Sequence, residues 1–474
     1  MSNQRAGETP IAFGTDGWRA VIADGFTDHN LERVAQAYAD YLHGLGNGTP
    51  NVVVGYDRRF LSESFARIAA EVMAGNGIKL AMFDEAVPTP LVSWAVRETK
   101  AAGGIMITAS HNPAIFNGFK IKAPWGGSAS PEITAAVEHL VDAGDPKRAA
   151  LPADLGQESL TAEVASYRTQ IASYVDLDRL RATEGTVIVD PMHGSGGHWV
   201  ESFLTGGKLQ VETVRGDRDP LFGGVNPEPI DQNIGALKAR VKATGAFLGL
   251  ATDGDADRLG AANEKGETLN MHEVVPLMLL HLLRDRKKTG GVVRTFSQSI
   301  LLKRIAKAHN IALHETPIGF KYVADLMIND DILLGAEESG GIGVRDHIPE
   351  RDGILNSLLL LEAVVASGKT PSQMVKDMHR EFGEFYFGRI DVKCEVADGK
   401  ALVARVAKKP PASLSGYSVR DVQTTDGTKL IFNDESWLLF RQSGTEPLLR
   451  IYSEATTKSM LRDLLQAGAT MAPA

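Results

Sequence analysis

The chain has 474 residues, which is enough for about three domains, with two to four allowed. Its hydrophobic content of 43% and charged content of 23% are typical of a soluble globular protein with several apolar cores. The formal net charge of -9 argues against bulk binding of nucleic acid, although it is compatible with local basic pockets for phosphate. A single cysteine, Cys394, excludes an internal disulfide framework and fits a reducing compartment.

Targeting and membrane signals are not found in the sequence. Residues 1–7 lack the apolar core of a secretory signal. The longest apolar stretches, such as residues 274–283, are too short and too interrupted to span a bilayer. These features predict a cytoplasmic protein with no membrane partner and no nucleic-acid partner. They do not indicate an oligomeric state.

Short apolar runs alternate with helical patterns from the first section of the chain onward. We expect a strand at residues 51–54 and a helix at 62–74, then a strand at 78–83 and a helix at 91–98. In the second section we expect strands at residues 186–189 and 246–251 and a helix at 199–204. In the third section we expect strands at residues 292–295, 311–314 and 332–334. Helices are expected between them, at residues 301–308 and 322–327. This alternation indicates βαβ units and mostly parallel sheets.

The C-terminal section has a different pattern. Residues 387–396 and 437–441 alternate apolar and polar side chains, as antiparallel strands with one buried face do. The predicted fold class is therefore α/β, with three similar α/β domains of mixed, mostly parallel sheets and a smaller C-terminal α+β domain around a central cleft. The expected domains are residues 1–155, 156–259, 260–375 and 376–474.

The first stretch with chemical interest ends an apolar run at Ile107. It presents Ser110 with His111 beside it, and Lys120 follows on a second apolar run. A serine at the end of a strand, with two basic residues nearby in the chain, suits a nucleophile with proton-transfer partners. The alternative is an ordinary turn, set by Asn112-Pro113.

An acidic loop follows the expected strand at residues 246–251. Asp253, Asp255 and Asp257 alternate there, and their mutual repulsion favours a bound divalent cation such as Mg²⁺. A solvated acidic turn is the alternative. An EF-hand would use Glu264 as its twelfth residue, but Arg258 occupies the sixth position, where that motif requires glycine.

Two further loops carry polar groups suited to a sugar phosphate. Residues 335–341 place carboxylates and a hydroxyl on a glycine-rich turn, which suits neighbouring sugar hydroxyls, although an ordinary turn has the same composition. Residues 441–447 combine an arginine, two hydroxyls and a glycine, which suits an anion. The alternative for this second loop is a polar hairpin turn.

The stretch Thr108-Ala109-Ser110-His111-Asn112-Pro113 resembles the phosphoserine loop of the α-D-phosphohexomutases. Residues 253–258, 335–341 and 441–447 are similar to the metal, sugar and phosphate loops of that family. Two smaller stretches, residues 13–19 and 316–321, also match. The resemblance spans the chain, because the motifs follow one another in the order of the family.

The resemblance implies a phosphoserine enzyme that moves a phosphoryl group between the 1- and 6-positions of a hexose. Ser110 would carry the phosphoryl group, and one of its oxygens would join the three aspartates in binding Mg²⁺. Arg19 and Arg258 would lie near the transferring group. Lys120 and His111 would be the general acid and base, with Lys120 favoured, and a lysine base would need a depressed pKa.

The same resemblance implies a set of substrate contacts. These are Gly319, Lys321, Glu337, Ser339, Arg441, Ser443, Gly444 and Thr445. Some family members have a histidine where Gly341 stands, and His347 is a candidate substitute.

Glucose phosphate is the substrate that the resemblance favours, because residues 316–321 look closer to the phosphoglucomutase branch, and glucose 1,6-bisphosphate would be the activator. Phosphomannomutase or dual specificity is the first alternative, and phosphoglucosamine mutase is less favoured. A sugar phosphatase, a non-catalytic sugar-phosphate sensor and a structural Ca²⁺ site are more distant alternatives.

Overall fold

The computed structural model describes residues 4, 5, 7–14, 17–46, 48–151, 155, 160–443 and 447–473. The chain divides into two compact units. The first comprises residues 1–269, 327–330 and 339–371, and the second comprises residues 270–326, 331–338 and 372–474. Within the described part of the chain, no helix is long and apolar enough to cross a membrane.

The first sheet of the first unit has five strands. Their order is β1 (Gly17–Val21), β5 (Phe116–Lys122), β4 (Gly103–Ile107), β2 (Asn51–Tyr56) and β3 (Lys79–Met82). Strand β2 runs parallel to β3 and β4, whereas β5 is antiparallel to both of its neighbours. Strand β2, which lies between β4 and β3, is almost wholly buried and rich in valine, as expected for a strand covered on both faces.

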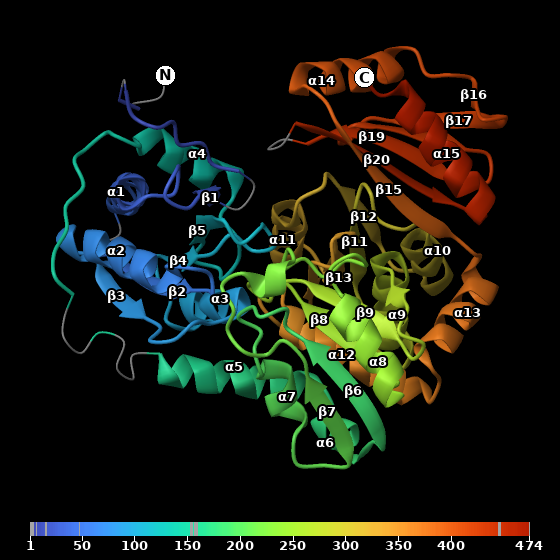
Figure 1. The fold of residues 1–474 in the computed structure, drawn as a ribbon, viewed down its shortest axis with the longest axis horizontal. Helices are drawn as coiled ribbons and strands as arrows, with labels where there is room; N and C mark the ends of the chain where they lie inside the picture. The colour runs from blue at the N-terminus through green and yellow to red at the C-terminus, as the bar shows by residue number, and fades with distance from the viewer. Residues whose placement is uncertain are drawn as a thin grey trace. The chain divides into compact units, whose positions relative to one another are not determined.

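Helices cover this sheet. They are α1 (Asp28–Gly44), α2 (Ser62–Gly75), α3 (Thr89–Glu98) and α4 (Pro131–Leu140), and α5 (Thr161–Tyr174) lies outside α3. Helix α1 packs against α2 and α4, and α3 packs against α5, β2 and β4 (Figure 1). Helix α1 begins after Thr27, whose side chain accepts a hydrogen bond from the Asn30 N–H and so caps the helix.

The second sheet of this unit repeats the first in order and direction. Its strands are β10 (Thr268–Leu269), β9 (Leu259–Asn263), β8 (Leu248–Thr252), β6 (Gly185–Asp190) and β7 (Leu209–Thr213). Strand β6 is parallel to β7 and β8, and β9 is antiparallel to β8 and β10. The accompanying helical elements are α6 (Leu177–Ala182), α7 (Trp199–Leu204), η1 (Phe222–Gly224), α8 (Gly235–Thr244) and α12 (Gly353–Ser367). The loops after β4 and β8 therefore occupy equivalent positions in the two sheets.

The second unit begins with a parallel three-stranded arrangement. Its strands are β12 (Leu313–Thr316), β11 (Gly291–Thr295) and β13 (Ile332–Ala336), with β11 between the other two. The helices of this section are α9 (Met271–Arg284), α10 (Ile300–His309), α11 (Phe320–Asn329) and α13 (Pro371–Phe382). After β13 the chain continues into the first unit, where β14 (Ile342–Val344) precedes α12.

The C-terminal part of the second unit is an antiparallel sheet. Its order is β15 (Tyr386–Lys393), β20 (Leu448–Ala455), β19 (Trp437–Gln442), β18 (Thr428–Phe432), β17 (Tyr417–Gln423) and β16 (Ser413–Leu414). Helices α14 (Val396–Lys408) and α15 (Lys458–Met471) pack against β19 and β20 (Figure 1). Leu402, Leu438, Ile451 and Leu464 belong to the buried core of this section.

The predicted fold class is confirmed: mixed sheets that contain parallel strands are followed by a smaller α+β section. The helix expected at residues 199–204 is found with the same bounds. The strand expected at 311–314 begins later, at Leu313, because the Ile311 N–H still bonds to the Ala306 carbonyl at the end of α10. The domain boundaries near residues 155, 259 and 375 remain predictions.

Candidate active site

Ser110 lies in the loop that joins β4 to β5, and it is 1% exposed. Its φ angle is 53°, in the left-handed region that residues other than glycine seldom adopt. The Ser110 N–H donates to Thr108 Oγ1 at 2.8 Å. The serine is therefore held in an uncommon backbone conformation by a contact inside its own loop.

Two residues at the end of β2 support this loop. Arg59 is fully buried and donates to the carbonyl oxygens of Ser110 and Asn112, both at 2.6 Å. Asp57 accepts a hydrogen bond of 2.5 Å from Thr108 Oγ1 and lies 3.2 Å from Arg59 Nε. Sequence reasoning missed both residues. The available signal was their position as charged residues directly after a buried strand that pairs with β4.

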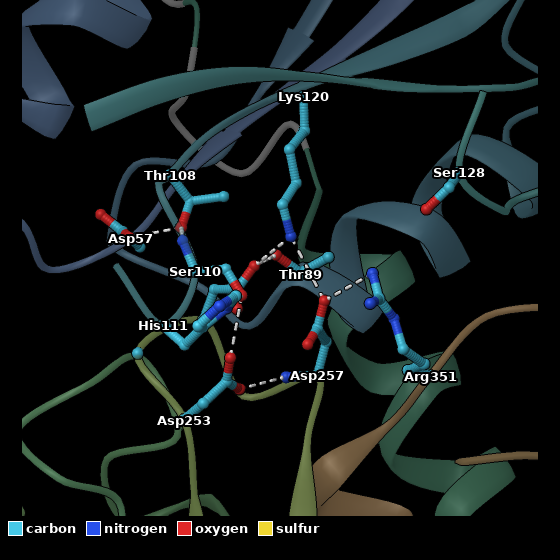
Figure 2. A network of polar contacts seen from close by, with 12 residues as sticks. Asp57, Thr89, Thr108, Ser110, His111, Lys120, Ser128, Asp253, Asp257 and Arg351 are labelled. Atoms are coloured by element: carbon cyan, nitrogen blue, oxygen red, sulfur yellow. Dashed lines mark hydrogen bonds and ion pairs between the residues drawn. The ribbon is translucent and has the colours of Figure 1, made fainter. Parts of the chain in front are cut away.

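The acidic loop between β8 and β9 meets the serine (Figure 2). Asp253, Asp255 and Asp257 are fully buried, and one oxygen from each lies within 4.8 Å of the others. Ser110 Oγ donates to Asp253 Oδ2 at 2.9 Å. The close approach requires Gly254, because a Cβ there would lie 2.4 Å from the Ser110 carbonyl oxygen.

The three carboxylates fit a hard divalent cation. Thr89 Oγ1 and Lys120 Nζ donate to Oδ2 of Asp255, at 2.6 and 2.7 Å. The Oδ1 atoms of Asp255 and Asp257 are buried and have no hydrogen-bond partner among the residues that the structure describes. Burial and the two neighbouring carboxylates raise the pKa of Asp253 well above its usual value, and a cation would remove this repulsion. Carboxylate oxygens together with a serine oxygen are ligands that suit Mg²⁺.

Cationic side chains hold the other oxygens of the triad. Lys120, on β5 and 1% exposed, lies 3.2 Å from Asp257 Oδ2 in addition to its contact with Asp255. Arg351 Nη2 lies 2.9 Å from the same oxygen of Asp257 (Figure 2). Sequence reasoning predicted Lys120 but missed Arg351 and Thr89. The charged residues just before α12 were a weak signal for Arg351, and Thr89 offered none.

Two further arginines and His111 lie around the serine loop. Arg19 Nη1 donates to Asn112 Oδ1 at 2.8 Å, and the Arg258 side chain is 11% exposed. The Nδ1 atom of His111 lies 3.4 Å from Ser110 Oγ. Burial lowers the pKa of His111 well below its usual value, and the positive charges of Arg258 and Arg19 lower it further. The imidazole is therefore neutral at neutral pH.

In the second unit, Asp426 brings two of the predicted substrate loops together. Its Oδ2 atom accepts hydrogen bonds from the Ile318 N–H at 2.9 Å and from Arg441 Nε at 3.0 Å. Gly319 and Lys321 follow Ile318 directly, and Gly319 has a φ angle of 137°, which favours glycine. Burial would lower the pKa of Arg441, yet the Asp426 carboxylate raises it. Sequence reasoning missed Asp426.

The remaining predicted substrate residues lie on both units. Glu337 follows β13 in the second unit and is 6% exposed, and Ser443 follows β19 and is 3% exposed. Ser339 belongs to the first unit and precedes β14. Gly444 and Thr445 lie outside the described residues.

His347 is placed in a packed internal cluster. Its side chain is 1% exposed, and its Nε2 atom lies 2.8 Å from Asp352 Oδ2. The ring stacks on Trp94 with 5.6 Å between centroids, and the hydroxyl of Tyr167 donates to the same Asp352 oxygen at 2.8 Å. The sequence suggested a substrate contact for His347. Its enclosed side chain instead packs between the end of β14 and the first-unit helices α3 and α5.

The chain matches four family descriptions in succession. "Phosphoglucomutase/phosphomannomutase, alpha/beta/alpha" domains I, II and III match residues 10–148, 165–266 and 270–382. The C-terminal domain of the same family matches residues 392–470. Together these matches cover most of the chain.

Similar proteins carry names from several branches. A "Phosphoglucomutase/phosphomannomutase" of Thermococcus kodakarensis is 33% identical, over 96% of this chain and 97% of its own. A "Probable phosphoglucosamine mutase" of Methanothermobacter thermautotrophicus is 31% identical, over 96% of each chain. The crystal structure of a "putative phosphomannomutase" from Thermus thermophilus is 37% identical, has a TM-score of 0.86, and covers 98% of this chain and 99% of its own. The chain therefore belongs to the phosphoglucomutase/phosphomannomutase family, whose members are phosphotransferase isomerases.

Proposed function

We propose that this protein interconverts hexose 1-phosphate and hexose 6-phosphate, with glucose as the preferred sugar, through a phosphoserine at Ser110. The observation that carries the proposal is the 2.9 Å hydrogen bond from Ser110 Oγ to Asp253 within a buried carboxylate triad. Two oxygens of this triad are buried and accept no hydrogen bond from the described residues, and Lys120 contacts the other oxygen of each of these carboxylates. A simple turn or a solvated acidic loop would not bury these groups together.

Mg²⁺ is the proposed metal, held by Asp253, Asp255, Asp257 and an oxygen of Ser110 or of its phosphoryl group. When bound, it would polarise the phosphoryl group and offset the negative charge that develops on the serine oxygen. Arg258 and Arg19 would add positive charge on the side of the loop that faces the transferring group.

The proposed reaction moves one phosphoryl group at a time. The bond between Ser110 Oγ and phosphorus breaks as a sugar hydroxyl oxygen bonds to phosphorus, and the hydroxyl proton passes to a base. Lys120 is the favoured base, and neutral His111, 3.4 Å from Ser110 Oγ, is the second candidate. The resulting hexose 1,6-bisphosphate turns around and returns its other phosphoryl group to Ser110. Glucose 1,6-bisphosphate would act as the activator, because it phosphorylates the free serine.

The substrate is proposed to bind through residues of the sugar and phosphate loops. The proposed contacts are Gly319, Lys321, Glu337, Ser339, Arg441, Ser443, Gly444 and Thr445. The guanidinium of Arg441, with Nε on Asp426, is oriented by a carboxylate, which suits forked recognition of a phosphate. A substrate contact of His347 stays a prediction, and in the structure its Nε2 atom lies 2.8 Å from Asp352 Oδ2.

Dual specificity for glucose and mannose phosphates is the second candidate. The names of similar proteins favour it. The Thermococcus relative has both activities in its name, and the Thermus structure is named a phosphomannomutase. The two sugars differ only at the 2-hydroxyl, so their discrimination depends on the pose of one group.

A coupled assay tests these alternatives with the purified protein, Mg²⁺ and a trace of glucose 1,6-bisphosphate. Glucose 1-phosphate, mannose 1-phosphate and glucosamine 1-phosphate are compared at equal concentration. The proposal predicts the fastest isomerisation for glucose 1-phosphate. Comparable rates with mannose 1-phosphate would establish dual specificity. Release of inorganic phosphate without isomerised sugar would show that the protein is a phosphatase and not a mutase.

A further inference from the structure

Glu350 is a fully buried carboxylate between β14 and α12 that the proposed reaction does not use. Its Oε2 atom accepts hydrogen bonds from Lys122 Nζ at 2.6 Å and from Ser128 Oγ at 2.8 Å. Its Oε1 atom accepts from the N–H of Arg351 at 3.0 Å and from Arg351 Nε at 3.3 Å. Both oxygens of Glu350 therefore accept hydrogen bonds, one from β5 and the turn that follows it and one from Arg351.

Arg351 connects Glu350 to the acidic triad. Its Nε atom is held by Glu350, while its Nη2 atom lies 2.9 Å from Asp257 Oδ2. Figure 2 shows this guanidinium directed at Asp257, on the side of the triad away from Ser110. A guanidinium can make these two contacts at once because its donors project from different edges of one rigid plane.

The network closes on itself through strand β5. Lys120 and Lys122 are two residues apart on this strand, so their side chains point to the same face of the sheet. Lys120 contacts Asp257 at 3.2 Å, and Lys122 contacts Glu350 at 2.6 Å. The chain of contacts therefore begins and ends on one strand. It runs from Lys120 to Asp257, Arg351, Glu350 and Lys122.

We propose that Glu350 and Lys122 are positioning residues for the metal centre, acting through Arg351. They fix the guanidinium so that it holds Oδ2 of Asp257, which would leave Oδ1 available to a bound cation. This arrangement requires an Asp257 Oδ1 without a hydrogen bond, and among the described residues it accepts none; its nearest cationic contact is Arg258 Nε at 4.0 Å. The inference rests on the proposed role of the aspartate triad as the metal site.

Energetics favour a positioning role over a purely stabilising one. A buried ion pair adds little to folding stability, because the cost of removing both charges from water offsets their attraction. Groups that orient metal ligands, by contrast, commonly change metal affinity about 10- to 100-fold when they are altered. A merely structural Glu350 would affect unfolding, whereas a positioning Glu350 affects the affinity of the folded protein for its metal.

The test is calorimetric titration of the full chain with Mg²⁺, without substrate. Glu350→Gln preserves the shape of the side chain and removes the charge that holds Lys122 and Arg351. Arg351→Lys keeps a positive charge but cannot contact Glu350 and Asp257 with two separate nitrogens, as the guanidinium does. Both variants are expected to bind Mg²⁺ about 10- to 100-fold more weakly than the wild type. The matched control is Asp142→Asn, a buried carboxylate paired with Arg33 in a different part of the first unit, which should leave the affinity unchanged.

A double variant covers the case in which Glu350→Gln does not fold. Lys122→Met with Glu350→Leu removes both charges of the pair, so neither is left buried without a partner, and it should also weaken Mg²⁺ binding. A folded variant without Glu350 that binds Mg²⁺ as tightly as the wild type would overturn the positioning role of Glu350, while the proposed function would still stand. If Asp255→Asn also binds Mg²⁺ as tightly as the wild type, the metal site itself is wrong and both proposals fail.

Discussion

At the scale of single residues, the conformation of Ser110 explains how the loop presents its hydroxyl. A non-glycine residue at a φ angle of 53° carries about 1–3 kcal/mol of strain. The hydrogen bonds from Arg59 to the loop carbonyls offset this cost, and Asp57 holds Thr108 in place. The strain therefore persists only because buried charged residues surround the loop, and the result is a hydroxyl fixed beside Asp253.

The first prediction concerns Gly254, where the two loops approach most closely. In Gly254→Ala the new Cβ would lie 2.4 Å from the Ser110 carbonyl oxygen, so one of the two loops has to move. A displacement of about 1 Å in reacting groups costs on the order of 100-fold in rate, and we expect kcat to fall by about that factor. Steady-state kinetics at saturating Mg²⁺ measures the change.

A matched glycine provides the control for this variant. Gly235→Ala adds a methyl group in the first turn of α8, where no atom lies within 4 Å of the new Cβ. Its activity should equal that of the wild type. Unchanged activity in Gly254→Ala would show that the spacing of the two loops does not matter for catalysis.

At the scale of elements, the repeated sheet order explains how distant parts of the sequence meet. The two sheets of the first unit have the same sequence of parallel and antiparallel pairs, and each places a polar loop after the equivalent strand, β4 or β8. In open α/β sheets the carboxyl ends of the strands are the usual location of binding sites. The loops of Ser110 and Asp253 occupy these ends.

The second prediction concerns Glu454 on β20, which links the C-terminal sheet to the beginning of α10. Its carboxylate accepts hydrogen bonds from Ser299 Oγ at 2.5 Å and from the Ile300 N–H at 2.9 Å. Burial alone would raise the pKa of this carboxyl from 4.5, yet His272, Ser299 and the N–H at the start of α10 lower it to about 2. The resulting stability is complete above pH 4.5 and is lost as the pH falls toward 2.

Glu454→Gln should therefore lower the free energy of unfolding by about 1–3 kcal/mol at pH 7, and by less as the pH falls below 4.5. Urea unfolding of the full chain at pH 7, 5 and 3.5 measures the difference between variant and wild type. Glu435→Gln is the control, because it removes a partly exposed partner of Lys303 and Arg304 and should cost less than about 1 kcal/mol. A difference for Glu454→Gln that is equal at all three pH values would contradict the assigned pKa.

The elements also show which parts of the site were predictable. Alternating strands and helices, and motifs at strand ends, predicted the loops that carry Ser110 and the three aspartates and the strand that carries Lys120. Thr89, Asp426 and Arg351 were not predicted, because each acts through a contact with a residue far away in the sequence. The surroundings of His347 were not predicted for a related reason: its ring lies against Trp94 and Tyr167, and no local pattern reveals that cluster; its role in substrate binding stays a prediction.

At the scale of the whole molecule, the proposed chemistry is divided between the two compact units. The first unit carries the residues proposed for phosphoryl transfer, including Ser110, Lys120 and the aspartate triad. The second carries Gly319, Lys321, Glu337 and Arg441, which are proposed to bind the sugar and its distal phosphate. Turnover is therefore expected to require both units, whereas Mg²⁺ binding is expected to require residues of the first alone.

The central claim is that Ser110 carries the phosphoryl group between the two positions of the sugar. The most direct test incubates the wild type and Ser110→Ala with Mg²⁺ and glucose 1,6-bisphosphate that is radiolabelled in both phosphoryl groups. Ser93→Ala is the control, because Ser93 is a fully buried serine on α3 whose hydroxyl has no hydrogen-bond partner in the described part of the chain. Label is expected on Ser110 in the wild type and in Ser93→Ala, with its transfer to added glucose 1-phosphate, and Ser110→Ala should take up none while remaining folded. Label on another residue, or full mutase activity in Ser110→Ala, would contradict the account.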